Sequence, residues 1–154
     1  EAGKHQAALL SDEIAFVEDY LGVARERYEN PLHFRYRGDP ALLSASVPPL
    51  LLQPLVENSL KHGIAPGETS LRMTLDAREA AGWFELEFAD DGVPHGNGVP
   101  GQRPGPPSLG IGLENLEQRV RHFAGPDARV EATPRTDGGF AVHMAWPIPT
   151  GGSE

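Results

Sequence analysis

Four polar side chains that could bind a charged ligand interrupt an apolar helical pattern between residues 51 and 63. They supply a carboxylate, an amide, an ammonium and an imidazole, from Glu57, Asn58, Lys61 and His62. Residues 57 and 61 are i,i+4 neighbours, as are residues 58 and 62, so the four side chains form one polar stripe along a helix. The stripe beside it is apolar and consists of Leu51, Leu52, Leu55, Val56, Ser59 and Leu60.

This polar stripe suits an anionic ligand held through a hard cation. Carboxylate and amide oxygens are ligands for Mg²⁺, whereas an ammonium and a helix-borne imidazole can face phosphate groups. The alternative is a solvated surface helix that carries one Glu57–Lys61 ion pair, which is a common arrangement. The stripe alone leaves both interpretations open.

Two glycine-bearing stretches further along the chain could complete such a site. Asp90 ends an alternating pattern just before Gly92, where a carboxylate can accept a hydrogen bond from an exocyclic amine, although an ordinary Asp-Gly turn would look the same. Residues 110–112, Gly-Ile-Gly, directly precede a helical pattern, so bare backbone could approach phosphates at a helix N-terminus. Asn115 and Arg119 follow on that helix as i,i+4 neighbours.

These motifs, in this order, resemble those of a known family. Residues 54–63, Pro-Leu-Val-Glu-Asn-Ser-Leu-Lys-His-Gly, resemble the N box of the ATP-binding domain of bacterial sensor histidine kinases, in the form of the LytS-like, autolysis-regulator group. Residues 89–92 look like its first glycine box, residues 110–116 are similar to its second, and residues 137–140 stand where the family has a Gly-Thr hairpin. The resemblance spans residues 9 to 149.

The resemblance implies a role for each candidate residue. Asn58 holds Mg²⁺, and Glu57 orients or deprotonates the histidine that accepts the phosphoryl group. Lys61 and His62 steady the phosphates. Asp90 accepts a hydrogen bond from the adenine N6 amine, so the site should prefer ATP to GTP. The nucleotide is also bound by Gly92, Gly110, Ile111, Gly112, Leu113 and Asn115.

The resemblance also implies cofactors and partners. The cofactors are ATP and Mg²⁺, and the partners are the phosphoacceptor histidine helix of the same protein, a response regulator and a second copy in a full-length homodimer. The family's acceptor, a histidine between Pro and Phe, is not in this sequence. The accepting histidine is therefore expected outside this chain, in a membrane-anchored sensor of which this is a cytoplasmic domain.

Two positions depart from the family's pattern. Pro94 stands where the first glycine box has a further glycine, and Phe140 replaces the threonine of the Gly-Thr hairpin. Residues 90–112 are rich in glycine and proline, which predicts a mobile loop that serves as a lid. We expect nucleotide binding to survive both departures and the movement of the lid to differ.

Hydrophobic periodicity predicts the elements that would position these residues. Helical spacing covers residues 11–28, with Ser11 as candidate N-cap, and residues 113–123. Pro54 either kinks the central helix or marks the start of its regular part. The apolar face of the first helix is either core or partner surface. Alternation predicts strands over residues 32–37, 71–77, 83–89, 129–133 and 139–147.

Helices and antiparallel hairpins in separate blocks predict an α+β fold, a two-layer sandwich whose mixed, mostly antiparallel sheet is covered by helices. The resemblance names it as the ATP-binding fold shared by histidine kinases, type II topoisomerases, Hsp90 chaperones and MutL repair proteins. Residues 1–30 would be a helical segment leading from the dimerisation and phosphoacceptor region, and residues 31–150 the ATP-binding catalytic domain.

Composition limits the alternatives. A chain of 154 residues fits one domain with a core of its own. The net charge of −9 argues against a surface that binds nucleic acid, and the absence of cysteine excludes disulfides and thiolate metal sites. No apolar stretch is long enough to cross a bilayer, and the chain has no signal peptide. We interpret it as a fragment of a longer protein.

Three functions fit the motifs. The first is the catalytic domain of a sensor histidine kinase. The second is an ATP-hydrolysing clamp of the Hsp90, gyrase or MutL kind, in which Glu57 activates water. The third is a nucleotide-binding interaction module without turnover, which would bind nucleotide and transfer phosphoryl groups to no acceptor.

Overall fold

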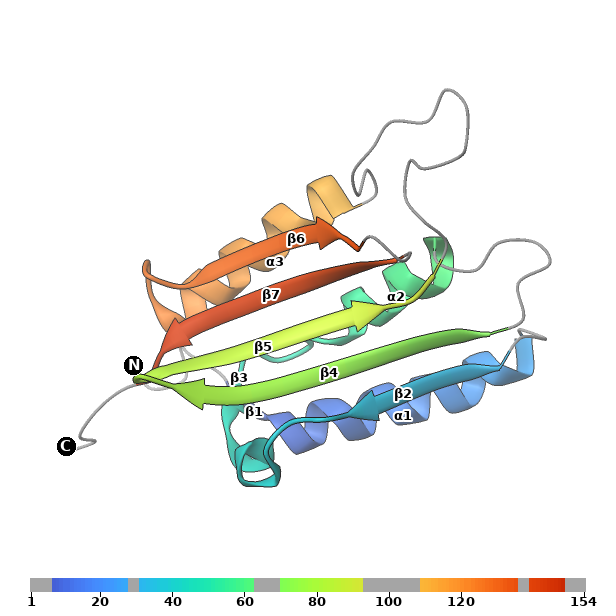
Figure 1. Cartoon of the computed structure of the whole chain (residues 1–154), viewed down its shortest axis with the longest axis horizontal. Coiled ribbons are helices and arrows are strands. Elements are labelled where there is room, and N and C mark those ends of the chain that lie inside the picture. Colours follow the sequence, from blue (N-terminus) through green and yellow to red (C-terminus); the bar gives the residue numbers. More distant parts are fainter. Residues whose placement is uncertain (1–6, 28–30, 63–69, 93–108, 136–138, 149–154) are drawn as a thin grey trace.

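The computed structural model describes residues 7–27, 31–62, 70–92, 109–135 and 139–148. Its helices are α1 (Leu10–Arg27), the 3₁₀ helix η2 (Pro40–Ser44), α2 (Gln53–His62) and α3 (Leu109–Ala124). Its strands are β1 (Ala8–Leu9), β2 (Leu32–Tyr36), β3 (Ser46–Val47), β4 (Leu71–Ala80), β5 (Trp83–Asp90), β6 (Arg129–Pro134) and β7 (Phe140–Pro147). Figure 1 shows the long strands in front of the three α-helices.

The main sheet has the strand order β2-β4-β5-β7-β6. β2 runs parallel to β4, and the other neighbouring pairs are antiparallel. The prediction of a mixed, mostly antiparallel sheet is therefore confirmed. Periodicity did not predict the small β1–β3 ladder, because strands of two residues carry no alternation.

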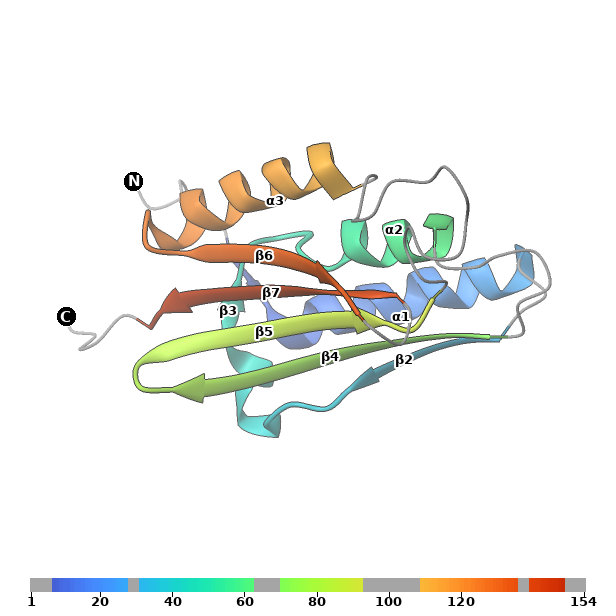
Figure 2. The same cartoon turned by 45° about the horizontal axis from the view of Figure 1, so that its top comes forward.

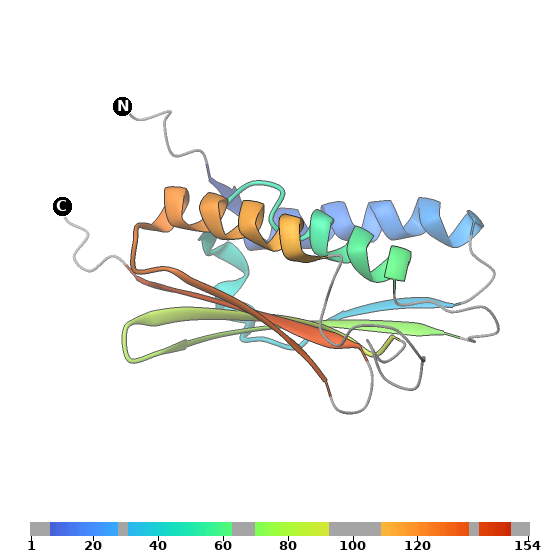
Figure 3. The ribbon, with the colours of Figure 1, turned by 90° about the horizontal axis from the view of Figure 1, so that it is seen from above.

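The α-helices cover one face of this sheet. Figure 3 shows the helices in one layer and the sheet in the other, and Figure 2 shows α2 between α3 and α1. The predicted two-layer α+β sandwich is confirmed. In the described part of the chain no helix is long and apolar enough to cross a membrane.

Alternation along the strands decides which side chains meet the helices. The covered face carries Leu71, Met73, Leu75 and Ala77 from β4, and Phe84, Leu86 and Phe88 from β5. Asp90, the last residue of β5, continues this alternation and is only 2% exposed. The strand pattern therefore places a carboxylate on the covered face of the sheet, where the core ends.

The helices bury the faces that periodicity predicts. Val17 and Leu21 of α1, and Leu116 and Val120 of α3, join the same core as the strands. The whole predicted apolar stripe of α2, including the lead-in residues Leu51 and Leu52, is buried. On β2, Leu32 is buried and His33 is exposed, as the alternation of a strand requires.

α1 also leaves apolar side chains on its outer side. Phe16 is 45% exposed and Val23 is 64% exposed. The predicted apolar face, with Val17, Leu21 and Ala24, is buried in the core of this chain.

Some predicted boundaries were wrong. α1 begins at Leu10, so Ser11 lies inside the helix and is not its N-cap. β4 continues to Ala80, and the turn to β5 is the two-residue loop Ala81–Gly82. Both residues have positive φ, of 53° and 83°, as a type I′ hairpin turn requires. The open question at Pro54 is settled, because it is the second residue of α2 and marks the start of the helix.

Candidate functional site

Asp90 is a buried carboxylate that α2 and the chain after β5 hold from two sides. Its Oδ2 accepts a hydrogen bond from Ser59 Oγ of α2 at 2.5 Å. Its Oδ1 accepts one from the backbone N–H of Gly92 at 3.0 Å. A buried charge requires such donors, since an unpaired carboxylate in the core would be very costly. These contacts join the end of β5 to the helix that carries the polar stripe.

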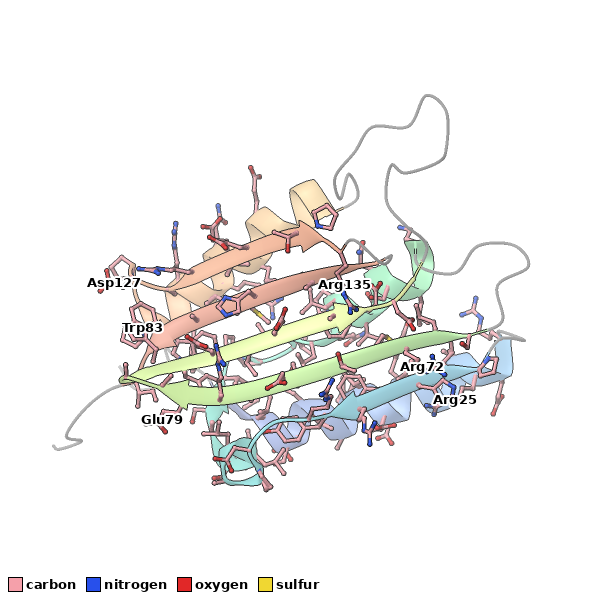
Figure 4. The ribbon with its side chains drawn as sticks, in the orientation of Figure 1. Arg25, Arg72, Glu79, Trp83, Asp127 and Arg135 are labelled. Atoms are coloured by element: carbon pink, nitrogen blue, oxygen red, sulfur yellow. The ribbon has the colours of Figure 1, made fainter. Side chains whose placement is uncertain are left out.

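The backbone of Asp90 is also fixed. Its carbonyl oxygen accepts a hydrogen bond from Nη1 of Arg135 at 2.9 Å. Figure 4 shows Arg135 just beyond the end of β6, beside the end of β5 and the start of β7. Gly139 has φ of +74°, and a Cβ there would fall against the carbonyl and Oδ1 of Asp90. Glycine at position 139 therefore allows the positive φ and also lets the chain before β7 approach Asp90.

Asp91, the next residue, has a different role. Its Oδ1 accepts a hydrogen bond from the backbone N–H of Arg72 at 2.7 Å, and its N–H donates to the Arg72 carbonyl at 3.0 Å. The Arg72 guanidinium lies 3.8 Å from Asp91 Oδ2, with both side chains largely exposed. Asp91 therefore fastens the end of β5 to the start of β4, and the buried Asp90 is the carboxylate on the covered face.

The polar stripe of α2 lies on the exposed side of the helix. Glu57 and Lys61 are exposed and Asn58 is half-buried, while Ser59, one position further on, is 1% exposed and faces Asp90. Glu57 Oε2 accepts a hydrogen bond from Gln53 Nε2 at 2.7 Å. His62 is the last residue of α2, and its side chain is outside the described part of the structure.

The second glycine stretch lies inside a helix, which differs from the prediction. α3 begins at Leu109, so Gly110 and Gly112 belong to its first turn and do not precede it. The first four N–H groups of an α-helix have no partner within the helix. Here they include those of Leu109, Gly110 and Ile111, and the N–H of Gly112 is the first that can bond within the helix. Free backbone donors and a helix dipole therefore still meet at these residues.

Further along α3, Asn115 is exposed, as a ligand-binding side chain can be. The guanidinium of Arg119 donates through Nη2 to the carbonyls of Pro49 and Leu50, the latter at 2.8 Å. Leu113 lies in the helix, but its side chain is outside the described part. Pro94 and most of the predicted lid also lie outside the described residues. Phe140 belongs to β7, but its side chain is outside the described part.

The candidate residues gather at one end of the sandwich. In Figures 1 and 2 the end of β5, the last turn of α2 and the first turn of α3 all point toward the end where β4 begins. This end combines a buried carboxylate, an exposed polar stripe and free helix N–H groups. Such a combination can bind a ligand with a hydrogen-bond donor at one end and an anion at the other.

Sequence reasoning missed several residues around this site. Ser59 was grouped with the apolar stripe, although a lone hydroxyl among leucines was a signal that it needs a partner. Glu13 lies in the first turn of α1, where carboxylates are common, but it is also buried and bonds to residues 50–52, which no local pattern indicated. Nothing in the sequence marked Arg135 as a partner of Asp90.

Known proteins similar to this chain include several sensor histidine kinases, although no protein-family model matches it. The sensor histidine kinase BtsS of Escherichia coli K12 is 25% identical over 138 residues, which cover 90% of this chain and 23% of BtsS. The sensor protein LytS of Oceanobacillus iheyensis is 26% identical over 145 residues, covering 90% of this chain and 25% of LytS. YwpD of Bacillus subtilis is 28% identical over 141 residues, covering 86% of this chain and 47% of YwpD. The chain thus spans from about a quarter to about half of the length of these relatives.

Solved structures show the same fold. The catalytic domain of the histidine kinase ThkA matches with a TM-score of 0.60 at 14% identity, over 92% of this chain and 94% of that domain. The histidine kinase domain of the Erythrobacter litoralis blue-light-activated kinase EL346 matches with a TM-score of 0.58 at 17% identity, over 91% of this chain and 65% of that one. The chain is therefore a homologue of LytS-like sensor histidine kinases and has the fold of a histidine kinase catalytic domain.

Proposed function

We propose that this chain is the ATP-binding catalytic domain of a sensor histidine kinase, which transfers the γ-phosphoryl group of Mg·ATP to a histidine outside the chain. The observation that supports this most is the buried carboxylate of Asp90, held by Ser59 where the polar stripe of α2 meets the end of β5. The similarity to sensor histidine kinases along most of the chain supports the same function.

Asp90 would recognise the adenine ring. Each carboxylate oxygen can accept more than one hydrogen bond, so the bonds from Ser59 and Gly92 leave acceptor capacity for a further donor. The N6 amine of adenine is such a donor, whereas guanine carries a carbonyl oxygen at the equivalent position. Two acceptors would then face each other, so the site should bind ATP more tightly than GTP.

The exposed stripe of α2 and the first turn of α3 would hold the phosphates. The Asn58 amide is half-buried, and its oxygen is the kind of ligand that Mg²⁺ takes in proteins. Lys61, His62 and the free N–H groups of Gly110 and Ile111 would compensate phosphate charge, and Gly112 would leave room for the phosphates to approach the backbone. When bound, Mg²⁺ neutralises charge on the phosphate oxygens during transfer.

In the transfer, a nitrogen of the accepting imidazole forms a bond to the γ-phosphorus while the bond from that phosphorus to the bridging oxygen breaks, and ADP leaves. The proton of the imidazole passes to the Glu57 carboxylate, which is exposed and held on one side by Gln53. Phosphoryl transfer depends mainly on positioning and charge stabilisation. The acceptor helix of the same protein, in a homodimer, would bring the imidazole to this end of the sandwich, and a response regulator would then receive the phosphoryl group. The domain would lie on the cytoplasmic side of a membrane-anchored sensor.

Labelling tests this function. A protein that joins this chain to the upstream helices of its own full-length form should acquire acid-labile phosphate from γ-labelled ATP, because the helices bring the acceptor close. The same protein with Asn58→Ala should acquire much less. Release of inorganic phosphate without labelled protein would indicate a hydrolysing clamp, and nucleotide binding with neither outcome would indicate a module without turnover.

A further inference from the structure

The segment that leads into α2, residues 49–52, is held by charged side chains from both other α-helices. Glu13 of α1 is only 7% exposed and accepts three backbone N–H groups from this segment. Leu50 donates to Oε2 at 2.8 Å, and Leu51 and Leu52 donate to Oε1 at 2.8 and 3.1 Å. From the other side, Arg119 of α3 donates to the carbonyls of Pro49 and Leu50. One short segment thus joins all three α-helices.

The conformation of the segment depends on these bonds. Leu50 has φ of 58°, a left-handed conformation that is uncommon for leucine. Its side chain is 50% exposed, so burial of that side chain does little to hold it in place. Strained residues persist where their surroundings fix them. Here Glu13 binds the N–H of Leu50 and Arg119 binds its carbonyl, so the two charged groups fix both sides of the same residue.

The segment sets the position of the polar stripe. The carbonyl of Leu52 accepts a hydrogen bond from the N–H of Val56 at 3.0 Å, in the first turn of α2, and Glu57 and Asn58 follow directly. α2 has only 10 residues and no acidic residue in its own first turn. A helix this short takes its stability from tertiary contacts. Glu13 supplies from α1 the negative charge that favours the N-terminal end of a helix.

We propose that Glu13 and Arg119 are positioning residues for nucleotide binding. By holding residues 49–52 between α1 and α3, they fix Asn58 and Glu57 relative to the first turn of α3, where Gly110 and Gly112 lie. This inference rests on the proposed function. The adenine end of the site depends less on this arrangement. Asp90 lies on β5, and although Ser59 of α2 contacts it, Gly92 and Arg135 also hold it from outside α2.

The separation gives a test that distinguishes positioning from a purely structural role. Loss of folded protein weakens nucleotide binding with and without Mg²⁺ by the same factor. Displacement of Asn58 weakens only the Mg²⁺-dependent part. The experiment is calorimetric titration of the chain with a non-hydrolysable ATP analogue, in Mg²⁺ and in chelator, at a temperature where circular dichroism shows each variant to be folded.

The two main variants are Arg119→Met, which removes both hydrogen bonds to the segment, and Glu13→Gln, which keeps the size of the side chain. In Glu13→Gln the amide NH₂ replaces one acceptor oxygen and faces a backbone N–H. We expect each to raise the dissociation constant in Mg²⁺ about tenfold or more, since small misplacements of a catalytic group are costly. The dissociation constant in chelator should stay within about twofold.

Three further variants serve as controls. Arg119→Lys should restore Mg²⁺-dependent affinity, because one ammonium has three donors and can serve both carbonyls. Arg121→Met removes a comparable bond from the same helix, to the Ala128 carbonyl at 3.2 Å, and should change neither affinity. Glu18→Gln changes an exposed carboxylate of α1 and should also be silent. The double variant Glu13→Gln, Arg119→Met should lose less Mg²⁺-dependent affinity than the product of the two single fold-losses, because both residues act on one segment.

The outcomes separate the two claims. A parent chain that binds no nucleotide overturns the proposed function, and this proposal with it. The other outcome is that the parent binds nucleotide, and the Arg119→Met and Glu13→Gln variants fold. If these variants lose affinity equally in Mg²⁺ and in chelator, or lose none, this proposal alone is overturned. If one of these variants does not fold, the other decides, because they act from different helices.

Discussion

Asp90 is the residue proposed to recognise adenine, and its contacts allow a substitution that tests this role without disturbing the fold. Asp90→Asn can keep both intramolecular contacts, since the amide oxygen can accept from Gly92 and the serine hydroxyl can turn to accept from the amide NH₂. The charge and the acceptor that face the ligand are lost. Binding of ATP should weaken by roughly 1 to 3 kcal/mol with the fold intact.

The measurement is a titration of parent and variant with ATP and GTP. The parent should prefer ATP, and the variant should lose most of that preference. Equal affinity of the parent for the two nucleotides would contradict the assignment of Asp90.

A substitution at Asn58 tests the proposed metal end of the site. Because its side chain is half-buried on the exposed side of α2, Asn58→Ala should leave the unfolding midpoint nearly unchanged. The variant should lose Mg²⁺-dependent affinity for ATP and keep the affinity measured in chelator. Gln118→Ala, an exposed amide on α3, is the matched control. If Asn58→Ala binds Mg·ATP as tightly as the parent, another residue holds the metal.

Glycine is required at position 139 for two reasons, the positive φ of its backbone and the close approach of Asp90. Gly139→Ala would have to adopt φ near +74° and place a methyl group against Asp90, so it should destabilise the fold by about 1 kcal/mol or more and weaken ATP binding. Gly22→Ala is the control, because a Cβ there meets nothing within 4 Å and lies in a helix. It should stabilise the fold by about 0.5 to 1 kcal/mol. Urea denaturation measures both, and a neutral Gly139→Ala would refute the close-contact argument.

The sequence predicted site residues where the chemistry is local and missed them where the partner is distant. Asp90 was recognisable because alternation brought it to a strand end before a glycine. Its partner Ser59 lies 31 positions earlier, and the partners of Glu13 begin 37 positions later. A pattern within one element shows which side of a helix or strand is buried, but not which distant group a buried polar atom meets.

At the scale of elements, the β4–β5 turn offers a stabilising substitution. Ala81 and Gly82 both have positive φ, and asparagine tolerates that conformation at the first position far better than alanine. Ala81 is exposed and makes no core contact that would be lost. Ala81→Asn should therefore raise the free energy of unfolding by about 0.5 to 1 kcal/mol, measured by urea denaturation.

The turn substitution should leave nucleotide affinity unchanged, because the turn lies at the end of β5 opposite to Asp90. A lower unfolding midpoint for Ala81→Asn would mean that the turn is not type I′ in solution.

Periodicity predicted every long element, and its errors lie at their ends. Leu109 to Gly112 fell within the predicted loop of residues 90–112, because glycine disfavours helix by about 1 kcal/mol, yet α3 includes them. Ser11 fits an N-cap by residue type, but the helix starts one residue earlier. Propensity is a weak guide at such positions, because packing of the first turn against the rest of the fold can override it.

At the scale of the molecule, the layers follow from the sequence but the strand order does not. Alternating strands and amphipathic helices must bury their apolar faces against each other, which gives the sandwich. The placement of β7 between β5 and β6 depends on pairing between distant segments, such as Phe88 with Val142. Local pattern contains no information about that choice.

The whole chain should bind ATP yet fail to phosphorylate itself. None of its six histidines lies in the Pro-His-Phe setting of the family's acceptor; they are His5, His33, His62, His95, His122 and His143. His33 and His143 lie on the face of the sheet that the helices do not cover, away from α2 and α3, which carry the proposed phosphate contacts. Incubation with γ-labelled ATP should give no acid-labile label. Such a label on the isolated chain would show that an acceptor lies within it.

We propose above all that this end of the sandwich binds Mg·ATP through an adenine contact and a metal-dependent phosphate contact. Calorimetric titration of the chain with a non-hydrolysable ATP analogue, in Mg²⁺ and in chelator, and with the matching GTP analogue, tests it most directly. We expect saturable binding of one ATP analogue per chain, tighter in Mg²⁺ and weaker for the guanine form. No binding, or binding that depends on neither Mg²⁺ nor the base, would contradict it.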